Sequence, residues 1–400
     1  MSSATPTHSA FCALDLLPST DRNNRALWED NCYCEIATST NELRQHLAAW
    51  TDLSRDATEA NVFLEPFAML PALEAFPTDS LRVVLIFRNG RTPQTPRQLC
   101  GLIPFVVIRD GLLTGCQWQL WGHDYCFLRT PLLRAGCEVE SLAAFVDWAA
   151  IASDGPALLD LPGCCGDDNF FRAFAEVVSQ RSLLVEHVAS HSRAMLRRVD
   201  DWTILAADAI SSHNRRELRR QWRRLGDLGQ IEIRSLEHER ELFHWTESFL
   251  SLESQGWKGD GGTALSKDPI AEAYFREVLT VACENQRLQM MAIHLNGEPI
   301  AMKVNLLAAP GSFAFKIAYD ERHAKFSPGV HLEIENMRSF HESTSLQWMD
   351  SCAAPRHPMI NRLWTERRLI QHVRVSTGNI RGNLTIGTRS LLRSIRRSMR

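Results

Sequence analysis

The sequence lacks any hydrophobic run of the roughly 18 residues that a membrane-spanning helix needs. It also lacks, near its start, the charged segment followed by an apolar stretch that is typical of a secretion signal. These absences argue against a helical membrane protein and predict a cytoplasmic chain. The net charge is only −3 at pH 7, so no overall field attracts nucleic acid.

The 11 cysteines include no CxxC pair and no His/Cys spacing typical of a zinc site. Cys32-x-Cys34 and the adjacent Cys164-Cys165 are isolated. An odd number of cysteines without a secretion signal indicates reduced, mostly buried thiols. The sequence therefore predicts no structural metal.

Lysine is scarce, with five residues among 44 Lys and Arg, and all five lie in the second half of the chain. One interpretation is codon bias combined with chance. The other is that a compact ammonium charge is needed near one site, because Arg and Lys are not interchangeable there.

A chain of 400 residues exceeds one ordinary hydrophobic core, which predicts two domains. Both halves show the same order of elements: a hairpin, a strand, a polar loop, a helix and a short strand ending in Asp. The first copy spans Leu81 to Asp160 and the second spans Leu288 to Asp350, with a joint at 200–212. The pattern predicts two similar α/β units side by side, although common elements also recur by chance.

The central stretch of the second copy runs from a strand into a helix. Residues 312–319 alternate in part and are rich in aromatics, which predicts a strand, and 320–325 form a polar turn. Ser327 is a plausible N-cap, Pro328 suits the first helical position, and Gly329 removes a side chain where backbone N–H groups point outward. Such a helix start favours phosphate. The alternative is an ordinary capped helix after a hairpin.

Several motifs carry a family resemblance. From about Arg215 to Leu369, the sequence resembles the CelD-like (cellulose-biosynthesis type) acetyltransferases of the GNAT superfamily. The first half, about Glu35 to Arg198, resembles the degenerate leading unit of the same tandem proteins. The segments that carry the resemblance are Gly122-His123-Asp124-Tyr125, Gly256-Trp257-Lys258-Gly259, Asn296-Gly297-Glu298-Pro299-Ile300-Ala301, Tyr319-Asp320, Phe326-Ser327-Pro328-Gly329, and Trp364 in a Trp-x-Glu-Arg-Arg motif.

The resemblance implies an α/β fold with two GNAT-like units. It divides the chain into a polar arm (1–31), a degenerate first domain (32–200), an acyltransferase domain (213–385) and a basic tail (386–400). It implies an N-acyltransferase that moves an acyl group, most simply acetyl, from acetyl-CoA or another acyl-CoA to a primary amine. The implied acceptor is a small metabolite or an envelope-polysaccharide precursor.

One motif departs from the family pattern. The usual phosphate loop is Arg/Gln-x-x-Gly-x-Gly/Ala, whereas residues 325–331 contain one glycine and a proline that lacks a backbone donor. Acyl-CoA is therefore implied by the resemblance alone, and another acyl carrier remains open.

Three residues are candidates for the general base that the amine requires. Asp350 ends a strand that looks buried, where desolvation would raise its pKa, or it is a turn aspartate. Glu253 precedes a glycine-rich loop, or it is a solvated helix end. His357 lies between two prolines, or it is a loop histidine bonded to backbone. A further alternative is that Cys352 is a thiol nucleophile paired with His357.

The resemblance also implies two binding sets. The predicted acyl-CoA contacts are Lys316, Ile317, Ala318, Lys325, Ser327, Gly329, Val330 and His331. The predicted acceptor contacts are Trp257, Lys258, Tyr319, Asp320, Cys352 and Asn361.

Two other functions fit the same sequence. A Fem-type transferase using aminoacyl-tRNA is supported by the arginine-rich helix expected at 213–225, which otherwise is a solvated helix with a thin apolar stripe. A non-catalytic accessory protein is supported by the altered phosphate loop.

The tail at 390–400 has one apolar and one basic side, which suits an anionic membrane surface or a frayed end.

We predict that Gly329→Glu abolishes acyl-CoA binding and leaves the fold intact, because a carboxylate opposes phosphate. Isothermal titration calorimetry with acetyl-CoA checks this. Unchanged affinity removes the phosphate-site assignment.

Overall fold

A computed structural model describes residues 32–90, 96–109, 116–152, 155–200, 212–255 and 265–398, except for the side chains of 390–398. The expected arm at 1–31, most of the joint at 200–212 and most of the glycine-rich loop after Glu253 lie outside the described residues.

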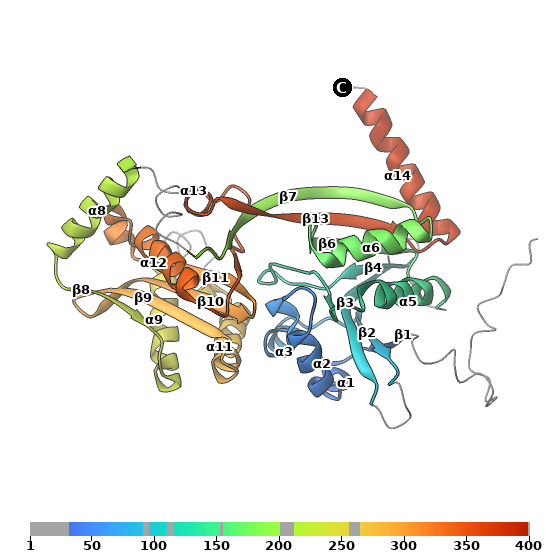
Figure 1. The fold of residues 1–400 in the computed structure, drawn as a ribbon, viewed down its shortest axis with the longest axis horizontal. Helices are drawn as coiled ribbons and strands as arrows, with labels where there is room; N and C mark the ends of the chain where they lie inside the picture. Colours follow the sequence, from blue (N-terminus) through green and yellow to red (C-terminus); the bar gives the residue numbers. More distant parts are fainter. Residues whose placement is uncertain are drawn as a thin grey trace, which may run out of the picture.

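The first half contains two groups of helices around a set of mostly antiparallel strands (Figure 1). Its elements are β1 (Cys32–Ala37), α1 (Thr40–Arg44), α2 (Leu47–Arg55), α3 (Pro66–Ala75), β2 (Leu81–Arg88), β3 (Gln98–Arg109), β4 (Cys116–Leu120), β5 (Leu132–Leu133), α5 (Glu138–Ile151), β6 (Leu158–Cys165), α6 (Asn169–Gln180) and β7 (Val185–Arg197).

The second half repeats a meander followed by a helix and a short strand. Its elements are α8 (Ser212–Gly226), β8 (Ile231–Ser235), α9 (Leu242–Ser254), α11 (Pro269–Glu284), β9 (Leu288–Leu295), β10 (Glu298–Ala308), β11 (Gly311–Tyr319), the 3₁₀ helix η6 (Glu321–Phe326), α12 (Pro328–Glu342), β12 (Trp348–Asp350), α13 (Ile360–Leu363), β13 (Glu366–Ser376) and α14 (Ile380–Ser398).

One mixed sheet runs through both halves of the described chain. Its strand order is β1-β2-β3-β4-β6-β13-β7-β12-β11-β10-β9-β8, and β5 pairs with β3. The order is symmetric about its centre. β4 pairs in parallel with β6 where Gln119 faces Asp160, and β11 pairs in parallel with β12 where Phe313 faces Asp350. The two aspartates singled out by the sequence pattern thus occupy equivalent places.

The halves exchange their last strands. β13 follows the second half in the chain but pairs with β6 of the first half, and β7 follows the first half but pairs with β12 of the second. β7 and β13 also pair with each other along most of their length, and they arch across the top of the molecule in Figure 1. The two-unit pattern in the sequence ends at Asp350 and does not include β13.

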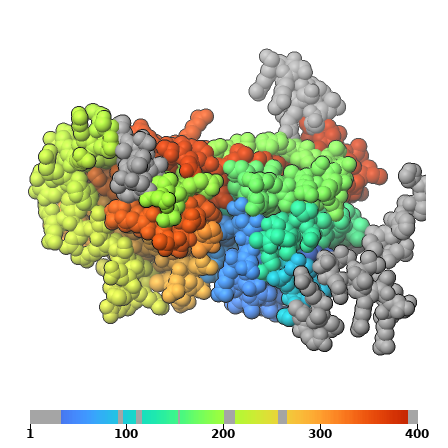
Figure 2. All heavy atoms as spheres, in the orientation of Figure 1, coloured from blue at the N-terminus to red at the C-terminus, as the bar shows by residue number. Residues whose placement is uncertain are grey.

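Helices cover both faces of the second half of the sheet. α9 and α11 pack on one face, where Phe249 and Phe275 join a core that continues into the first half at Phe63. α12 packs on the other face through Leu332 and Met337. In the space-filling view, the blue surface of the first helices adjoins the orange surface of the second half (Figure 2).

Local chemistry explains several of these boundaries. Asn296 and Gly297 both have positive φ angles, 54° and 86°, as a tight two-residue hairpin turn between β9 and β10 requires. α11 begins with Pro269 at its first position, and the side chain of Asp268 accepts hydrogen bonds from the N–H groups of Ile270 and Ala271.

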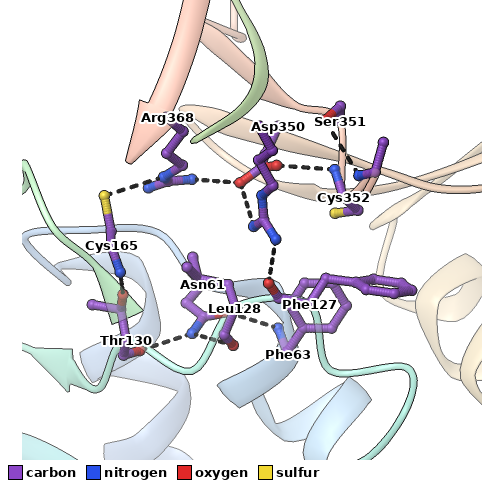
Figure 3. Close-up of polar contacts among 12 residues, drawn as sticks. Asn61, Phe63, Phe127, Leu128, Thr130, Cys165, Asp350, Ser351, Cys352 and Arg368 are labelled. Carbon is purple, nitrogen blue, oxygen red and sulfur yellow. Dashed lines mark hydrogen bonds and ion pairs between the residues drawn. The ribbon is translucent and has the colours of Figure 1, made fainter. Parts of the chain in front are cut away.

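A buried ion network joins the halves where the strands exchange (Figure 3). Asp350 Oδ2 accepts hydrogen bonds from Arg193 Nη2 on β7 (2.7 Å) and from Arg368 Nη1 on β13 (3.1 Å). Arg193 Nη1 donates to the Phe127 carbonyl (2.5 Å), and Arg368 Nε donates to Cys165 Sγ (3.3 Å), both in the first half. The Asp350 side chain is fully buried, so water does not replace these partners.

Helix α14 occupies most of the segment expected to be a basic tail, because it extends to Ser398. Within the described ranges, no helix combines the length and apolar character needed to cross a membrane.

We predict that Asp350→Asn destabilises the protein by about 3–5 kcal/mol, because it leaves two buried arginines without their carboxylate. Urea denaturation followed by circular dichroism measures the change. Asp147→Asn is the control: it breaks an exposed ion pair with Arg181, for which the loss is about 0–1 kcal/mol. Equal losses in both variants would contradict the assignment.

The same network predicts a pH dependence. Burial alone raises the pKa of Asp350, but Arg193, Arg368 and the hydrogen bonds outweigh it and lower the pKa below its usual 3.8. A lowered carboxyl pKa contributes stability above the unfolded value, and that contribution is lost as the pH falls through the folded value. The stability difference between wild type and Asp350→Asn should therefore persist from pH 7 to about pH 4 and shrink below it.

Candidate functional site

A cavity of about 660 Å³ opens beside the end of β11 in the second half. Four segments form its walls: the end of α9, the end of β11, the η6–α12 junction and the loop after β12. The lining residues are Leu252, Glu253, Ile317, Ala318, Tyr319, Ala324, Ser327, Pro328, Gly329, Val330, Ala354, Arg356, His357, Pro358 and Met359.

The cavity exists because two neighbouring strands differ in length. β12 ends at Asp350, which faces Phe313, whereas β11 continues for six residues to Tyr319. The lining residues 317–319 lie on this continuation. Beyond Asp350 the chain leaves the sheet and returns as the 354–359 wall, so the opening lies at the edge of β11.

The start of α12 supplies the polar corner of the cavity. Pro328 occupies the first helical position, as predicted. The N–H groups of Val330 and His331 both donate to the Ser327 carbonyl, whereas Gly329 N–H has no acceptor among the residues that the structure describes. This corner therefore offers one unsatisfied backbone donor together with the positive end of the helix dipole.

The role expected for Ser327 is wrong in one respect. Ser327 does stand at the N-cap position, but its backbone is left-handed (φ 54°, ψ 48°) and its side chain makes no capping hydrogen bond. The turn from η6 into α12 sets this conformation, because Ser327 N–H donates to the Ala324 carbonyl as the C-cap of η6.

The segment that carries this cavity matches a known family. Residues 212–356 match the sequence model of a family described as Acetyltransferase (GNAT) domain. The second half is GNAT-like. The matched segment contains α9, β11, α12 and β12, and it ends within the wall that carries Arg356. No curated protein matches this chain in sequence.

Two solved structures share the fold over most of the chain. FemX superposes with a TM-score of 0.53 at 10% identity, covering 85% of this chain and 96% of that one. A conserved protein of unknown function from Bacteroides thetaiotaomicron VPI-5482 gives a TM-score of 0.52 at 10% identity, covering 85% and 99%. Identities this low show the fold alone. Together with the symmetric order of the sheet, the two superpositions support the expected architecture of two GNAT-like units.

The three candidate bases differ in their position and in their hydrogen bonds. Glu253 lines the cavity, is 2% exposed, and accepts a hydrogen bond from Leu265 N–H (3.0 Å). His357 lines it too, but Ile360 N–H donates to His357 Nδ1 (3.3 Å), which favours the tautomer with its proton on Nε2. In that tautomer Nε2 is a donor, so Glu253 is the better placed acceptor of a proton.

Asp350 does not have the properties predicted for a base. Its pKa was expected to be raised by burial, and instead it is lowered by the two arginines. Asp350 lies outside the cavity lining and connects β7, β12 and β13. A carboxylate held by two guanidinium groups is a poor proton acceptor.

Five of the eight predicted acyl-CoA contacts line the cavity: Ile317, Ala318, Ser327, Gly329 and Val330. The other three point to neighbouring rings. Lys316 Nζ lies 4.6 Å from the ring centre of Tyr125, and Lys325 Nζ lies 5.0 Å from that of Phe326. His331 packs on Trp222, and burial lowers its pKa to about 4.

The predicted acceptor contacts are mostly dispersed. Tyr319 lines the cavity, and Trp257 and Lys258 lie outside the described residues. Asp320 caps η6 and pairs with Arg322. Burial raises the pKa of Cys352, which disfavours a thiolate nucleophile. The Asn361 side chain donates to the Pro355 carbonyl.

No pattern in the sequence indicates that the first half approaches this site. Tyr125, in the Gly122-His123-Asp124-Tyr125 motif, contacts Lys316, the neighbour of cavity-lining Ile317, and stacks on Tyr274 of α11. Burial raises the pKa of Tyr125, as do the nearby carboxylates of Asp268, Glu253 and Asp124. Acidic groups from both halves thus lie near Tyr125, and one of them, Glu253, lines the cavity.

The corresponding opening in the first half is occupied by an arginine. The Arg129 side chain lies against Gly122, after β4, and against Gly163 of β6, at both of which a Cβ atom would contact it. Arg129 N–H also donates to the Gly163 carbonyl (2.9 Å). The side chain therefore fills the space between the segment that follows β4 and Gly163 of β6.

The structure adds a steric control to the Gly329 prediction. A Cβ atom at Gly329 would lie 3.3 Å from Tyr319 Cδ1, so any side chain there requires a small adjustment of the ring. We expect Gly329→Ala to weaken acetyl-CoA binding only a few-fold and Gly329→Glu to abolish it, as measured by calorimetry. Equal losses would show that shape, not charge, decides binding.

Proposed function

We propose that the protein is an N-acyltransferase that transfers an acyl group, most simply acetyl, from an acyl-CoA to a primary amine. The observation that supports this most directly is the cavity beside β11, which meets the start of α12 and whose lining, except for residues 357–359, belongs to the segment matching the GNAT domain. Its volume lies within the range of small-molecule sites, about 300–1,000 Å³.

The lining residues fit a ligand with an anionic end and an apolar middle. Gly329 N–H, the dipole of α12 and the guanidinium of Arg356 provide the positive end. Ile317, Ala318, Val330 and Met359 provide the apolar walls. Pro328 removes one donor, so we propose that this corner holds the coenzyme's pyrophosphate with fewer backbone contacts than the usual family loop provides.

The proposed chemistry assigns a task to each wall. Segment 317–319 of β11 positions the thioester carbonyl, and Glu253 accepts the proton that the ammonium must lose before it attacks. The amine nitrogen forms the new C–N bond, the C–S bond breaks, and the thiol leaves with a proton. The thioester itself supplies the activated acyl group.

We place the acceptor on the α9 side, toward the first half. Amine acceptors are cationic at neutral pH, and the carboxylates of Glu253, Asp268 and Asp124 favour a cation there. Together with the CelD-like resemblance, this supports an amine-bearing metabolite or polysaccharide precursor. The units that we propose, 32–200 and 213–385, then have different tasks: the second carries the donor site and the first borders the acceptor.

One observation favours a second candidate, an aminoacyl-tRNA-dependent transferase. Helix α8 packs against η6 at the cavity wall, and it carries exposed arginines at positions 216, 219, 220, 223 and 224. A basic surface beside a donor site suits a polyanionic donor. RNA that co-purifies, or tRNA binding that weakens steeply with salt while acetyl-CoA does not bind, would favour this candidate.

We predict that Glu253→Gln lowers kcat for acetyl transfer by about 10²–10⁴-fold, since it removes the proton acceptor. Release of free coenzyme A thiol, measured over a panel of amines, gives kcat, and calorimetry should show acetyl-CoA affinity within about twofold of wild type. Glu74→Gln, an exposed glutamate paired with Arg44, is the control and should retain full activity. Wild-type turnover in Glu253→Gln would refute the assignment, and no acetyl-CoA binding by wild type would refute the donor.

A further inference from the structure

A second, polar cavity of about 280 Å³ lies between the halves, away from the site described above. The first half provides α2 and the start of α3, and the second half provides the turn after α11, which packs against α3. The lining residues are Thr51, Ser54, Arg55, Glu65, Pro66, Phe67, Asn285, Gln286 and Arg287.

The notable group in this cavity is the Glu65 carboxyl. Its side chain is 5% exposed, and it accepts no hydrogen bond from any residue that the structure describes. Its nearest ionic partner is Arg287, whose Nη2 lies 3.4 Å from Glu65 Oε2. Burial raises the pKa of Glu65 to about 7, against the effects of Arg287 and Arg55. Apart from the Arg287 ion pair, this carboxyl has no donor in the described part of the chain, so it can accept hydrogen bonds from a further cation.

The opposite charge is available in the same cavity. The Arg55 guanidinium at the end of α2 forms no ion pair or hydrogen bond within the described part of the chain, yet it is close enough to lower the pKa of Glu65. A buried acceptor and a guanidinium donor therefore face one small space.

We propose that this cavity binds a free α-amino acid, with its ammonium on Glu65 and its carboxylate on Arg55. A ligand with a single charge would satisfy only one of the two groups. Thr51 and Gln286 provide further polar lining for a small zwitterion. The volume is below the usual range for drug-sized ligands, so the cavity suits a molecule of amino-acid size. An occupant would contact both halves at once.

The experiment is calorimetry on the full-length protein with L-alanine, L-serine and then the other common amino acids. Ethylamine and propionate serve as probes that carry only one of the charges. We expect saturable binding of at least one amino acid, with ethylamine and propionate at least tenfold weaker. Arg55→Met and Glu65→Gln should each weaken amino-acid binding at least tenfold. Arg55 is exposed, so its substitution should leave the fold unchanged by circular dichroism.

Two control variants test whether the amino acid binds in this cavity and nowhere else on the molecule. Arg44→Met removes an exposed arginine of the neighbouring helix α1 and should not alter binding. Glu253→Gln alters only the larger cavity, on the side where we place the acceptor, and should also leave amino-acid binding unchanged, which excludes capture of the amino acid there as an acceptor. The proposal is overturned if no amino acid binds, if propionate binds as tightly as the amino acid, or if Arg55→Met retains wild-type affinity.

Discussion

A buried carboxylate between two guanidinium groups holds the halves together at the strands that they exchange. Asp350 ends β12, and its partners Arg193 and Arg368 come from β7 and β13. A buried ion pair is weak evidence for net stability, because removing three charges from water offsets much of their attraction. Its position is the clearer consequence: the network lies where β12 stops, and the cavity opens where β11 continues beyond β12, paired with β10 on its other side.

The symmetric sheet gives the two halves the same arrangement of strands, but different side chains lie beside the strand ends. In the first half, Arg129 occupies the space beside β4 and β6, and its loop reaches the second half at Tyr125. In the second half, the space remains open and Gly329 N–H faces it without a protein acceptor among the described residues.

Sequence reasoning succeeded where local physics decides. The strand expected at 312–319 and the proline at the first position of α12 are set by nearby residues. β13 was missed because Glu366–Ser376 is rich in Arg and lacks a regular apolar alternation. What makes it a strand is a partner on each side, β6 and β7, both distant in sequence.

In the candidate site, too, features set by nearby residues could be predicted and features set by distant residues could not. The stretch 317–330 contains two of the four wall segments, so five of the acyl-CoA contacts predicted from the sequence line the cavity. It misjudged Asp350 because Arg193 is 157 positions away, and no local pattern indicates that such a charge will lie beside it. The contribution of Tyr125 was equally inaccessible, since it depends on how the halves pack.

The position of β13 has a consequence for biosynthesis. The space between β6 and β7 is filled by residues 366–376, so the N-terminal unit stays incomplete while the ribosome is still translating the rest. Such long-range pairing slows folding. A nascent chain released early would expose the unpaired edges of β6 and β7, which makes it a ready substrate for chaperones and proteases.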